Sequence, residues 1–218
     1  MIVENFGDVP FFKEAPPETV ALLTRCARAV VEAVGETPVG VNVLRNDARA
    51  ALACALASGA RFVRVNVHTS AAVTDQGLIE GRAAETLRLR EALGAGPGGP
   101  HPLSILADVH VKHASPLAAT ETLLDAARDA SDRGLADGLI LSGVATGSAP
   151  EPAALSEVRN ALPEACLWLG SGLNPANAAS LVPHLDGAIA GSAAEREGRA
   201  GNPVDPARAA ALVAAWRA

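Results

Sequence analysis

The chain has 218 residues, a length typical of one domain, and 49% of them are apolar, which is enough for a sizeable core. Its formal net charge of −6 and the lack of a basic stripe argue against a nucleic-acid partner. No apolar stretch is long enough to cross a membrane and no leader pattern opens the chain, so we expect a cytoplasmic protein without membrane insertion.

Seven strand-like apolar runs alternate with helical patterns along the chain. The runs cover residues 1–5, 39–43, 62–67, 103–109, 137–142, 166–170 and 186–191. The helical patterns between them cover 17–34, 47–58, 80–93, 116–133, 152–162, a short segment after Pro175, and 205–217. Such alternation predicts an α/β fold with a parallel sheet. Seven regular units favour a single (β/α)8 TIM-barrel domain over residues 1–218, N-terminally short because one strand is missing.

An ionisable cluster ends the fourth run, in "ILADVHVKHASP" (105–116). Asp108, His110, Lys112 and His113 follow the apolar residues, at the carboxyl end of a strand, where barrel active sites are built. Asp108 and His110 could transfer protons, and Lys112 could contact a phosphate, donate a proton or form an imine. The alternative is a solvated loop with incidental charges, and for His113 a cap on the next helix.

Polar residues on earlier strands are expected to share the barrel interior. Alternation places Arg64 and Asn66 on one face of their strand and three valines on the other, which suits contact with helices. Glu4 and Asn42 come from two earlier strands. A buried charge needs a partner, so Arg64 should pair with Asp108 or Glu4, either as a network that fixes strand register or as part of a site.

Two Gly-Ser turns near the C-terminus predict a phosphate site. Gly170, Ser171 and Gly172 would form one half, and Gly191 with Ser192 the other, because free backbone N–H groups in such turns bind anions. Each turn alone is weak evidence, since Gly-Ser also simply ends strands. The segment 141–150 adds four residues to the same rim, namely Ser142, Gly143, Thr146 and Gly147.

The loop 69–85 has the length and small residues of a lid over the mouth. Asp75, Gln76 and Glu80 are its polar candidates, and helix capping by Thr74 or Asp75 is the ordinary alternative.

Six segments in this order resemble motifs of the BtpA/SgcQ family. They are "ENFGDVPF" (4–11), "GVNVLRND" (40–47), "RVNVHTSAAVTDQGLIEGRAAE" (64–85), "ADVHVKHASPL" (107–117), "ADGLILSGVATG" (136–147) and "GSGLNPAN" (170–177). The resemblance implies a phosphate-binding TIM barrel. The founding cyanobacterial member is implicated in photosystem I biogenesis, and enterobacterial relatives lie beside sugar-uptake genes. It implies no established reaction.

One departure from that family concerns the start of the chain. Members normally begin with a further strand and helix that carry a "GMVHLxPLPG"-like segment, which is absent here. We favour a start codon placed too late. If the chain does begin at Met1, self-association to a homo-oligomer through open sheet edges is expected.

The preferred hypothesis is an enzyme that acts on a small phosphorylated, sugar-like molecule by proton transfer, as an isomerase, epimerase or lyase, without a cofactor. Asp108, His110, Lys112 and Glu4 would be catalytic. The alternative is a non-catalytic assembly factor of the photosystem I biogenesis type. A lesser option is a metal-dependent hydrolase using Asp108, His110 and His113. Lys112 argues against it because its charge would repel a cation, so no metal is expected.

Cys26, Cys54 and Cys166 lack a ligand spacing and are expected to be buried, reduced thiols.

Overall fold

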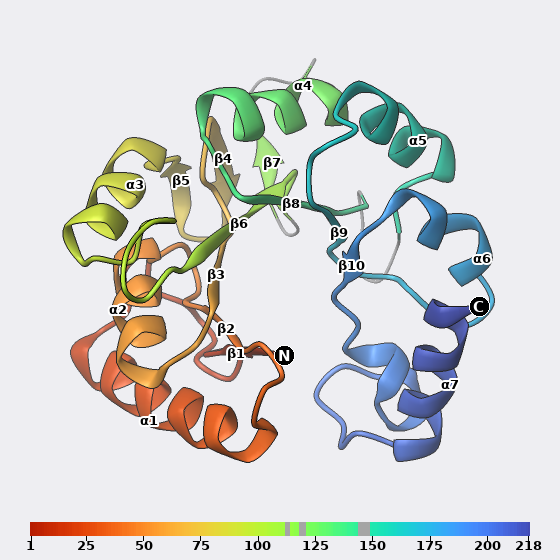
Figure 1. Cartoon of the computed structure of the whole chain (residues 1–218), viewed down its shortest axis with the longest axis horizontal. Coiled ribbons are helices and arrows are strands. Elements are labelled where there is room, and N and C mark those ends of the chain that lie inside the picture. The colour runs from red at the N-terminus through yellow and green to blue at the C-terminus, as the bar shows by residue number, and fades with distance from the viewer. Residues whose placement is uncertain (112–113, 118–120, 144–148) are drawn as a thin grey trace.

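The main element of the fold is a curled, seven-stranded parallel sheet. The computed structural model describes residues 1–111, 114–117, 121–143 and 149–218. The sheet order is β1-β2-β3-β6-β8-β9-β10, formed by Ile2–Glu4, Gly40–Asn42, Phe62–Val65, Ser104–Val109, Gly138–Leu141, Leu167–Leu169 and Gly187–Ala188. Figure 1 shows the sheet bent into a horseshoe with the helices on its outer side. This confirms a TIM-barrel-type fold with seven strands, whose edges are β1 and β10.

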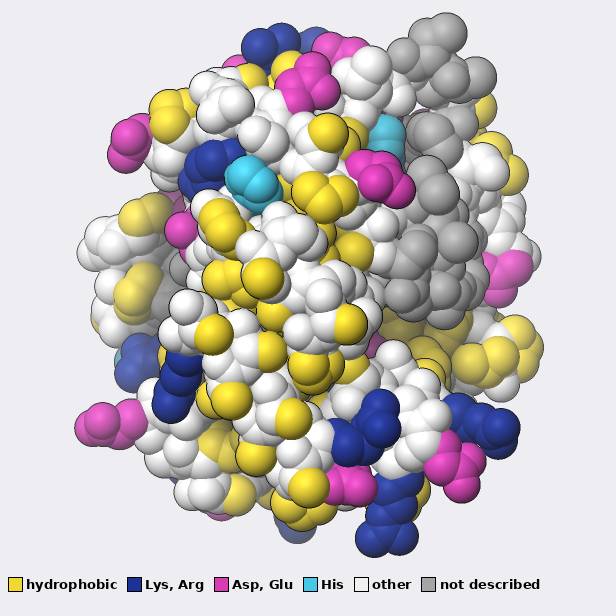
Figure 2. All heavy atoms as spheres, turned by 90° about the vertical axis from the view of Figure 1, so that its right-hand side faces the viewer, with side chains coloured by type: hydrophobic (Ala, Val, Ile, Leu, Met, Phe, Trp, Pro, Cys, Tyr) yellow, Lys and Arg dark blue, Asp and Glu magenta, His cyan; other side chains and the backbone are white. Residues whose placement is uncertain are grey.

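Helices follow most strands and cover the outer face of the sheet. The α-helices α1 to α7 span Pro17–Val34, Ala48–Ser58, Ala83–Ala92, Leu123–Arg128, Pro152–Ala161, Ala178–Leu181 and Pro206–Arg217. Shorter helical turns are η1 (Asp129–Arg133), η2 (Val182–His184), η3 (Ser192–Ala194) and η4 (Arg196–Gly198). On the face that carries α6 and α7, Figure 2 shows apolar side chains over the middle with polar and backbone atoms between them, and charged side chains of both signs toward its upper and lower ends.

Local sequence signals explain where the helices begin and end. Asp47 caps α2 by accepting a hydrogen bond from the Ala50 N–H, and Gly59 ends that helix in the left-handed conformation. Thr122 and Asp125 form a reciprocal capping box at the start of α4. Asp205 accepts from two backbone N–H groups at the start of α7.

The two faces of each strand have separate roles, as alternation predicts. Outward residues pack against helices in two apolar clusters, the first centred on Val41, Val63 and Ile105, the second on Leu139, Leu141 and Leu167. Inward residues at the amino ends of the strands form a third cluster that fills the base of the barrel interior. It comprises Phe62, Leu106 and Ile140, with Ile2, Trp168 and Ile189 packed against them.

Two aromatic rings in the base of the barrel occupy space next to glycines. A Cβ on Gly40 would collide with the Phe62 ring, and one on Gly187 would lie 2.6 Å from the Trp168 ring. In both cases the glycine is the register partner of the aromatic residue on the neighbouring strand. The absent side chains therefore make room for the only two large rings in this layer of the described chain.

An Asp-Gly pair starts two of the strands and ties each to its surroundings in the same way. Asp137 accepts hydrogen bonds from the Ile105 N–H and from Arg90 of α3, while Asp186 accepts from the Leu167 N–H and from Arg159 of α5. Each aspartate thus joins the neighbouring strand to the helix that precedes that strand. The device fixes strand register at the amino end of the sheet.

A small antiparallel sheet lies outside the barrel and replaces two predicted features. Its order is β5-β4-β7, with strands Gly77–Glu80, Ala71–Thr74 and Ser115–Pro116. The predicted lid loop 69–85 therefore contains a hairpin, and the predicted helix 116–133 begins only at residue 123. A further correction concerns the thiols, because Cys26 is exposed, Cys166 is partly exposed and only Cys54 is buried.

Candidate active site in the barrel mouth

The inner face changes from apolar to polar toward the carboxyl ends of the strands. Two residues further along each strand from the apolar base, the next inward residues are Glu4 on β1, Asn42 on β2, Arg64 on β3 and Asp108 on β6. Asn42 and Asp108 are buried, and Arg64 and Glu4 are partly buried. This is the end of the barrel where loops of different units meet, so the chain concentrates its polar interior there.

Asp108 is held by two neighbours on β3 and just beyond it. Its Oδ1 accepts from Arg64 Nε at 3.0 Å, and its Oδ2 accepts from Arg64 Nη2 at 3.0 Å and from Asn66 Nδ2 at 2.7 Å. The Asp108 side chain is fully buried, and that of Arg64 is 12% exposed. Burial alone would lower the pKa of Arg64, but the attraction and hydrogen bonds of Asp108 outweigh it and raise that pKa. The predicted pairing of Arg64 with Asp108 is therefore present.

A large cavity lies beside this network and is partly lined by Arg64 and Asn66. Its volume is about 570 Å³, and it is lined by residues of the β1–α1, β2–α2, β9–α6 and β10–η3 connections as well as by the polar layer. Glu4 faces it and accepts a hydrogen bond from Asn42 Nδ2 at 3.1 Å. Arg45 also lines it, with a pKa that burial lowers although Asp108 and Asp75 act in the opposite direction.

Two buried polar atoms near this cavity have no hydrogen-bond partner within the described chain. They are Asn66 Oδ1 and Ser142 Oγ, on residues that are 3% and 4% exposed. Asn66 lines the cavity, and its Nδ2 is already committed to Asp108. A buried acceptor without a donor is costly, so the free Oδ1 indicates a position where a ligand hydroxyl or a water would be bound.

Both predicted phosphate turns line the same cavity, in the part formed by β9 and β10. Gly170, Ser171 and Gly172 follow β9, while Gly191 and Ser192 follow β10. Gly170 has no room for a side chain because Ile140 and Ser142 pack against its Cα, and Gly172 has a φ of +83°. The first turn is braced by Asn177, whose Nδ2 donates to the Gly172 carbonyl at 2.8 Å.

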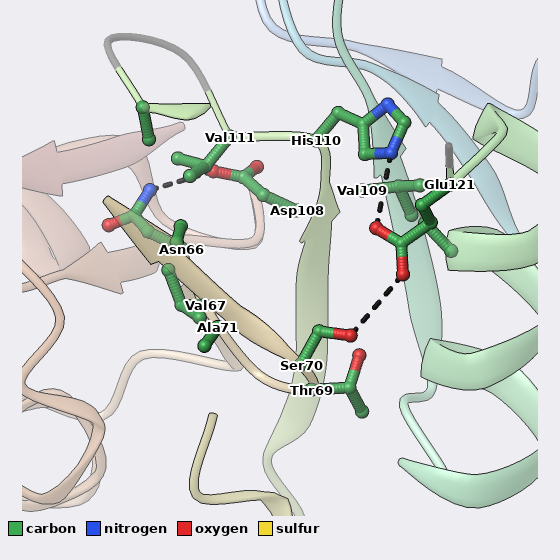
Figure 3. A pocket seen from close by; sticks show the side chains of 13 residues that line it. Asn66, Val67, Thr69, Ser70, Ala71, Asp108, Val109, His110, Val111 and Glu121 are labelled. Carbon is green, nitrogen blue, oxygen red and sulfur yellow. Dashed lines mark hydrogen bonds and ion pairs between the residues drawn. The ribbon is translucent and has the colours of Figure 1, made fainter. Parts of the chain in front are cut away.

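His110 differs from its expected orientation. Strand alternation would place it on the same face as Asp108, two residues earlier, but its φ of +57° breaks the alternation at the end of β6. Figure 3 shows the two side chains pointing in opposite directions, Asp108 toward Asn66 and His110 toward Glu121. His110 Nε2 lies 3.4 Å from Glu121 Oε2, an ion-pair distance without a well-formed hydrogen bond.

A second, smaller pocket of about 60 Å³ lies beside this histidine. It is lined by both Asp108 and His110, by Glu121, and by Ser70, whose Oγ lies 3.3 Å from Glu121 Oε1 (Figure 3). Ser70 also has a positive φ of 57°. The loops after β3 and β6 therefore both bend sharply where their side chains meet Glu121.

The predicted site residues thus fall into several groups. The large cavity gathers nine of them: Glu4, Asn42, Arg64, Asn66, Gly170, Ser171, Gly172, Gly191 and Ser192. Asp108 and His110 border the small pocket, and Asn66 lines both. Ser142 and Gly143 are buried and line neither. Lys112, His113, Thr146 and Gly147 lie outside the described residues.

Several residues of these pockets were not singled out from the sequence, and four of them carry large or charged side chains that matter here. Phe6, Phe11 and Arg45 line the large cavity, and Glu121 lines the small one. The two phenylalanines and Arg45 lie in loops after strand runs, which was a usable signal, whereas nothing in the sequence near Glu121 indicates a contact with His110. Among the described residues, no group of three or more His, Cys, Asp or Glu side chains is arranged to hold a metal ion.

Comparison with known proteins identifies relatives along the whole chain. The BtpA family model matches residues 1–218. The photosystem I biogenesis protein BtpA of Synechocystis is 45% identical over 216 residues, which cover 99% of this chain and 72% of that protein. An uncharacterized protein of Pyrococcus furiosus is 42% identical over 215 residues, covering 98% of this chain and 77% of the relative.

Solved structures share the fold at low sequence identity. TrpF from Jonesia denitrificans matches with a TM-score of 0.57 at 20% identity, over 89% of this chain and 78% of that one. A thiamine phosphate pyrophosphorylase from Pyrococcus furiosus matches with a TM-score of 0.56 at 18% identity, over 94% of this chain and 78% of that one. Within the described residues, no helix combines the length and apolarity needed to cross a bilayer.

Proposed function

The chain belongs to the BtpA family, and from this premise we propose that it is an enzyme that moves a proton on a small phosphorylated, sugar-like substrate. The observation that carries the proposal is the composition of one cavity of about 570 Å³. Two carboxylates (Glu4 and Asp75), two guanidinium groups and a free amide oxygen line it together with two Gly-Ser turns. A site that combines a base, cations and an anion-binding turn suits an isomerase, epimerase or lyase.

Glu4 is the carboxylate that we assign as the proton carrier. It faces the cavity and uses one oxygen to accept from Asn42, which leaves the other for substrate. In the proposed reaction Glu4 takes a proton from the carbon beside a carbonyl, and the C–H electron pair forms an enediolate. The hydroxyl proton passes between the two enediolate oxygens, and the protonated Glu4 returns its proton to the neighbouring carbon. Arg64 lines the same cavity, and its positive charge would stabilise the negative oxygen.

Asp108 takes a different role from the one expected from sequence. Its two oxygens are occupied by Arg64 and Asn66, so we assign it as the residue that positions these two groups. Asn66 then offers its free Oδ1 to a substrate hydroxyl. His110 and Glu121 form an adjacent pair in the small pocket, and Lys112 remains a proposed participant outside the described residues.

The two Gly-Ser turns are the proposed phosphate site. The turns after β9 and β10 supply backbone N–H groups and the Ser171 and Ser192 side chains on one side of the cavity. Their position after the last two strands corresponds to the phosphate site of many barrels.

Binding is tested by calorimetry with ribose 5-phosphate and with inorganic phosphate. We expect Ser192→Asp to weaken binding of both at least tenfold through charge repulsion, whereas Asn160→Asp, which adds the same charge at an exposed position of α5, leaves it unchanged. Equal binding by wild type and Ser192→Asp would remove the phosphate assignment.

Catalysis is tested by proton exchange in D2O with phosphorylated ketoses and aldoses, followed by proton NMR. We expect deuterium to appear at the carbon beside the carbonyl, and Glu4→Gln to abolish the exchange without loss of phosphate binding. Glu80→Gln is the matched control, because Glu80 is exposed and lines neither pocket. Exchange that persists in Glu4→Gln contradicts the role of Glu4.

A second candidate function is a non-catalytic assembly factor, which the name of the Synechocystis relative favours. Such a platform needs a continuous exposed apolar surface. On the described helices few large apolar residues are exposed, such as Leu22 on α1 and Val213 on α7, and the apolar side chains on the α6–α7 face in Figure 2 are separated in places by polar and backbone atoms. A pull-down that retains photosystem subunits would favour this second function.

A further inference from the structure

One wall of the large cavity is apolar and has no use in a site for a bare sugar phosphate. Phe6 and Phe11 come from the β1–α1 loop, while Leu173 and Ile189 come from the connections at the opposite edge of the sheet. A pentose phosphate presents polar atoms on nearly every side, and each of these needs a polar partner when water is removed. This wall therefore fits a different chemical group.

The size of the cavity leads to the same conclusion. Its volume of about 570 Å³ lies inside the range of roughly 300–1,000 Å³ that encloses drug-sized ligands. The polar layer around Glu4 and Arg64 and the two Gly-Ser turns line only part of this space. A ligand that fills the remainder must extend from the sugar toward the apolar wall.

The distribution of aromatic residues indicates what kind of group this is. Three of the four phenylalanines of the chain lie between residues 6 and 12, in one loop at the mouth. Phe6 is 56% exposed although it lines the cavity, whereas Phe62 is 7% exposed in the core. A half-exposed ring in a chain whose core is mostly aliphatic leaves a flat apolar face available for contact.

We infer that the ligand is a phosphorylated sugar that has a carbonyl and also carries a planar ring. AMP, whose closed sugar cannot form an enediolate, serves as a non-reacting binding probe of this class. This inference rests on the proposed function and names its substrate class. The phosphate would bind at the Gly-Ser turns, the sugar hydroxyls at Asn66 and Arg64, and the ring against Phe6 and Phe11. Stacking on a phenyl ring does not distinguish one base from another, so purines and pyrimidines both fit this contact.

Calorimetry with AMP, ribose 5-phosphate and adenosine tests the inference. We expect AMP to bind about tenfold more tightly than ribose 5-phosphate, the size of one base–aromatic contact. Phe6→Ala and Phe11→Ala should each reduce this ratio severalfold and leave ribose 5-phosphate binding unchanged. Phe12→Ala is the matched control, because Phe12 is 67% exposed, belongs to the same loop and does not line the cavity.

The outcomes separate this inference from the proposed function. Equal affinities for AMP and ribose 5-phosphate would overturn the inference and leave the phosphate site intact. Failure of AMP, ribose 5-phosphate and inorganic phosphate to bind would overturn the proposed function, and binding of adenosine as tight as that of AMP would remove the role of the turns. If an alanine variant does not fold, Phe6→Leu keeps an apolar side chain without the ring, and retention of the full AMP preference in it would contradict the stacking contact.

Discussion

Arg64 and Asp108 form a two-bond ion pair across β3 and β6, in which Arg64 lies opposite Leu106 and reaches two residues further along the neighbouring strand. The pair lies directly above the apolar cluster of Phe62, Leu106 and Ile140, where the barrel interior becomes polar. Its bonds are 3.0 Å long, and the Asp108 side chain has no contact with solvent. Replacing either residue by a neutral one leaves the charge of the other without its partner in the barrel interior.

We therefore predict that Asp108→Asn strongly destabilises the protein. Removing one member of a buried pair leaves the other unpaired, and the expected loss in the free energy of unfolding is about 3 kcal/mol. Glu32→Gln is the control, since the Arg28–Glu32 pair on α1 has side chains 58% and 61% exposed and should contribute about 0.5 kcal/mol or less. Urea denaturation measures both, and similar losses in the two variants would contradict the prediction.

A second prediction concerns the glycine beside the Trp168 ring. Gly187→Ala would bring a Cβ to 2.6 Å from the indole, so the ring or the strand has to move. Overpacking of this kind costs about 1–3 kcal/mol. Gly98→Ala has no atom within 4 Å of the added Cβ and should change stability by less than about 0.5 kcal/mol. Thermal unfolding followed by circular dichroism compares the two variants. An unchanged unfolding midpoint in Gly187→Ala would contradict the prediction and show that the base of the barrel is loosely packed.

The repeated aspartates at the amino end of the sheet give a third prediction. Asp137→Ala should cost about 3 kcal/mol, because Arg90 is only 6% exposed on its side chain and keeps just a carbonyl contact to Leu103. Asp186→Ala should cost about 1 kcal/mol, because Arg159 is 22% exposed and keeps three carbonyl partners. Denaturation curves rank the two variants, and the reverse order would contradict the argument from burial.

The fourth prediction is a loss of stability in mild acid that originates at His68. This histidine is 1% exposed and Nε2 lies 2.8 Å from the Gly134 carbonyl, while Nδ1 is buried and has no hydrogen-bond partner among the residues that the structure describes. Burial lowers its pKa below the ordinary value of 6.5, although the bond to Gly134 acts the other way. As the pH falls, the unfolded chain therefore binds a proton at a higher pH than the folded chain does. The contribution of neutral His68 to the free energy of unfolding is full above about pH 6.5 and declines below it.

Denaturation midpoints measured between about pH 7.5 and pH 5 test this assignment. His68→Gln retains an N–H for the Gly134 carbonyl but cannot be protonated, so its stability should depend less steeply on pH than that of the wild type. Identical slopes in the two proteins would show that other groups cause the acid sensitivity.

Much of the barrel could be predicted from periodicity and capping residues. All seven main strands form within the predicted segments, and the helix predicted at 17–34 has those bounds. The hairpin of β4 and β5 was missed because both strands are only four residues long and half of "AAVT" is alanine, which is depleted in strands. A turn signal was nevertheless available, since Gly77 with a φ of +86° follows Thr74, Asp75 and Gln76.

The candidate site was predicted in part for a physical reason. Alternation holds inside a strand, so Arg64 and Asp108 reach the barrel interior as expected. It fails where a strand ends, and the positive φ of His110 turns that side chain toward Glu121. Contacts such as His110–Glu121 depend on how two loops bend in space, and a single sequence contains no periodic signal for that.

The two ring-and-glycine pairs have a consequence for sequence variation. Phe62 needs the space at Gly40, and Trp168 needs the space at Gly187, so the residues at each pair of positions cannot diverge independently. A side chain at position 40 becomes acceptable only in a protein with a smaller residue at position 62, and the same holds for 187 and 168. Functional homologues should therefore show correlated substitutions within each pair, at positions 40 and 62 and at positions 187 and 168.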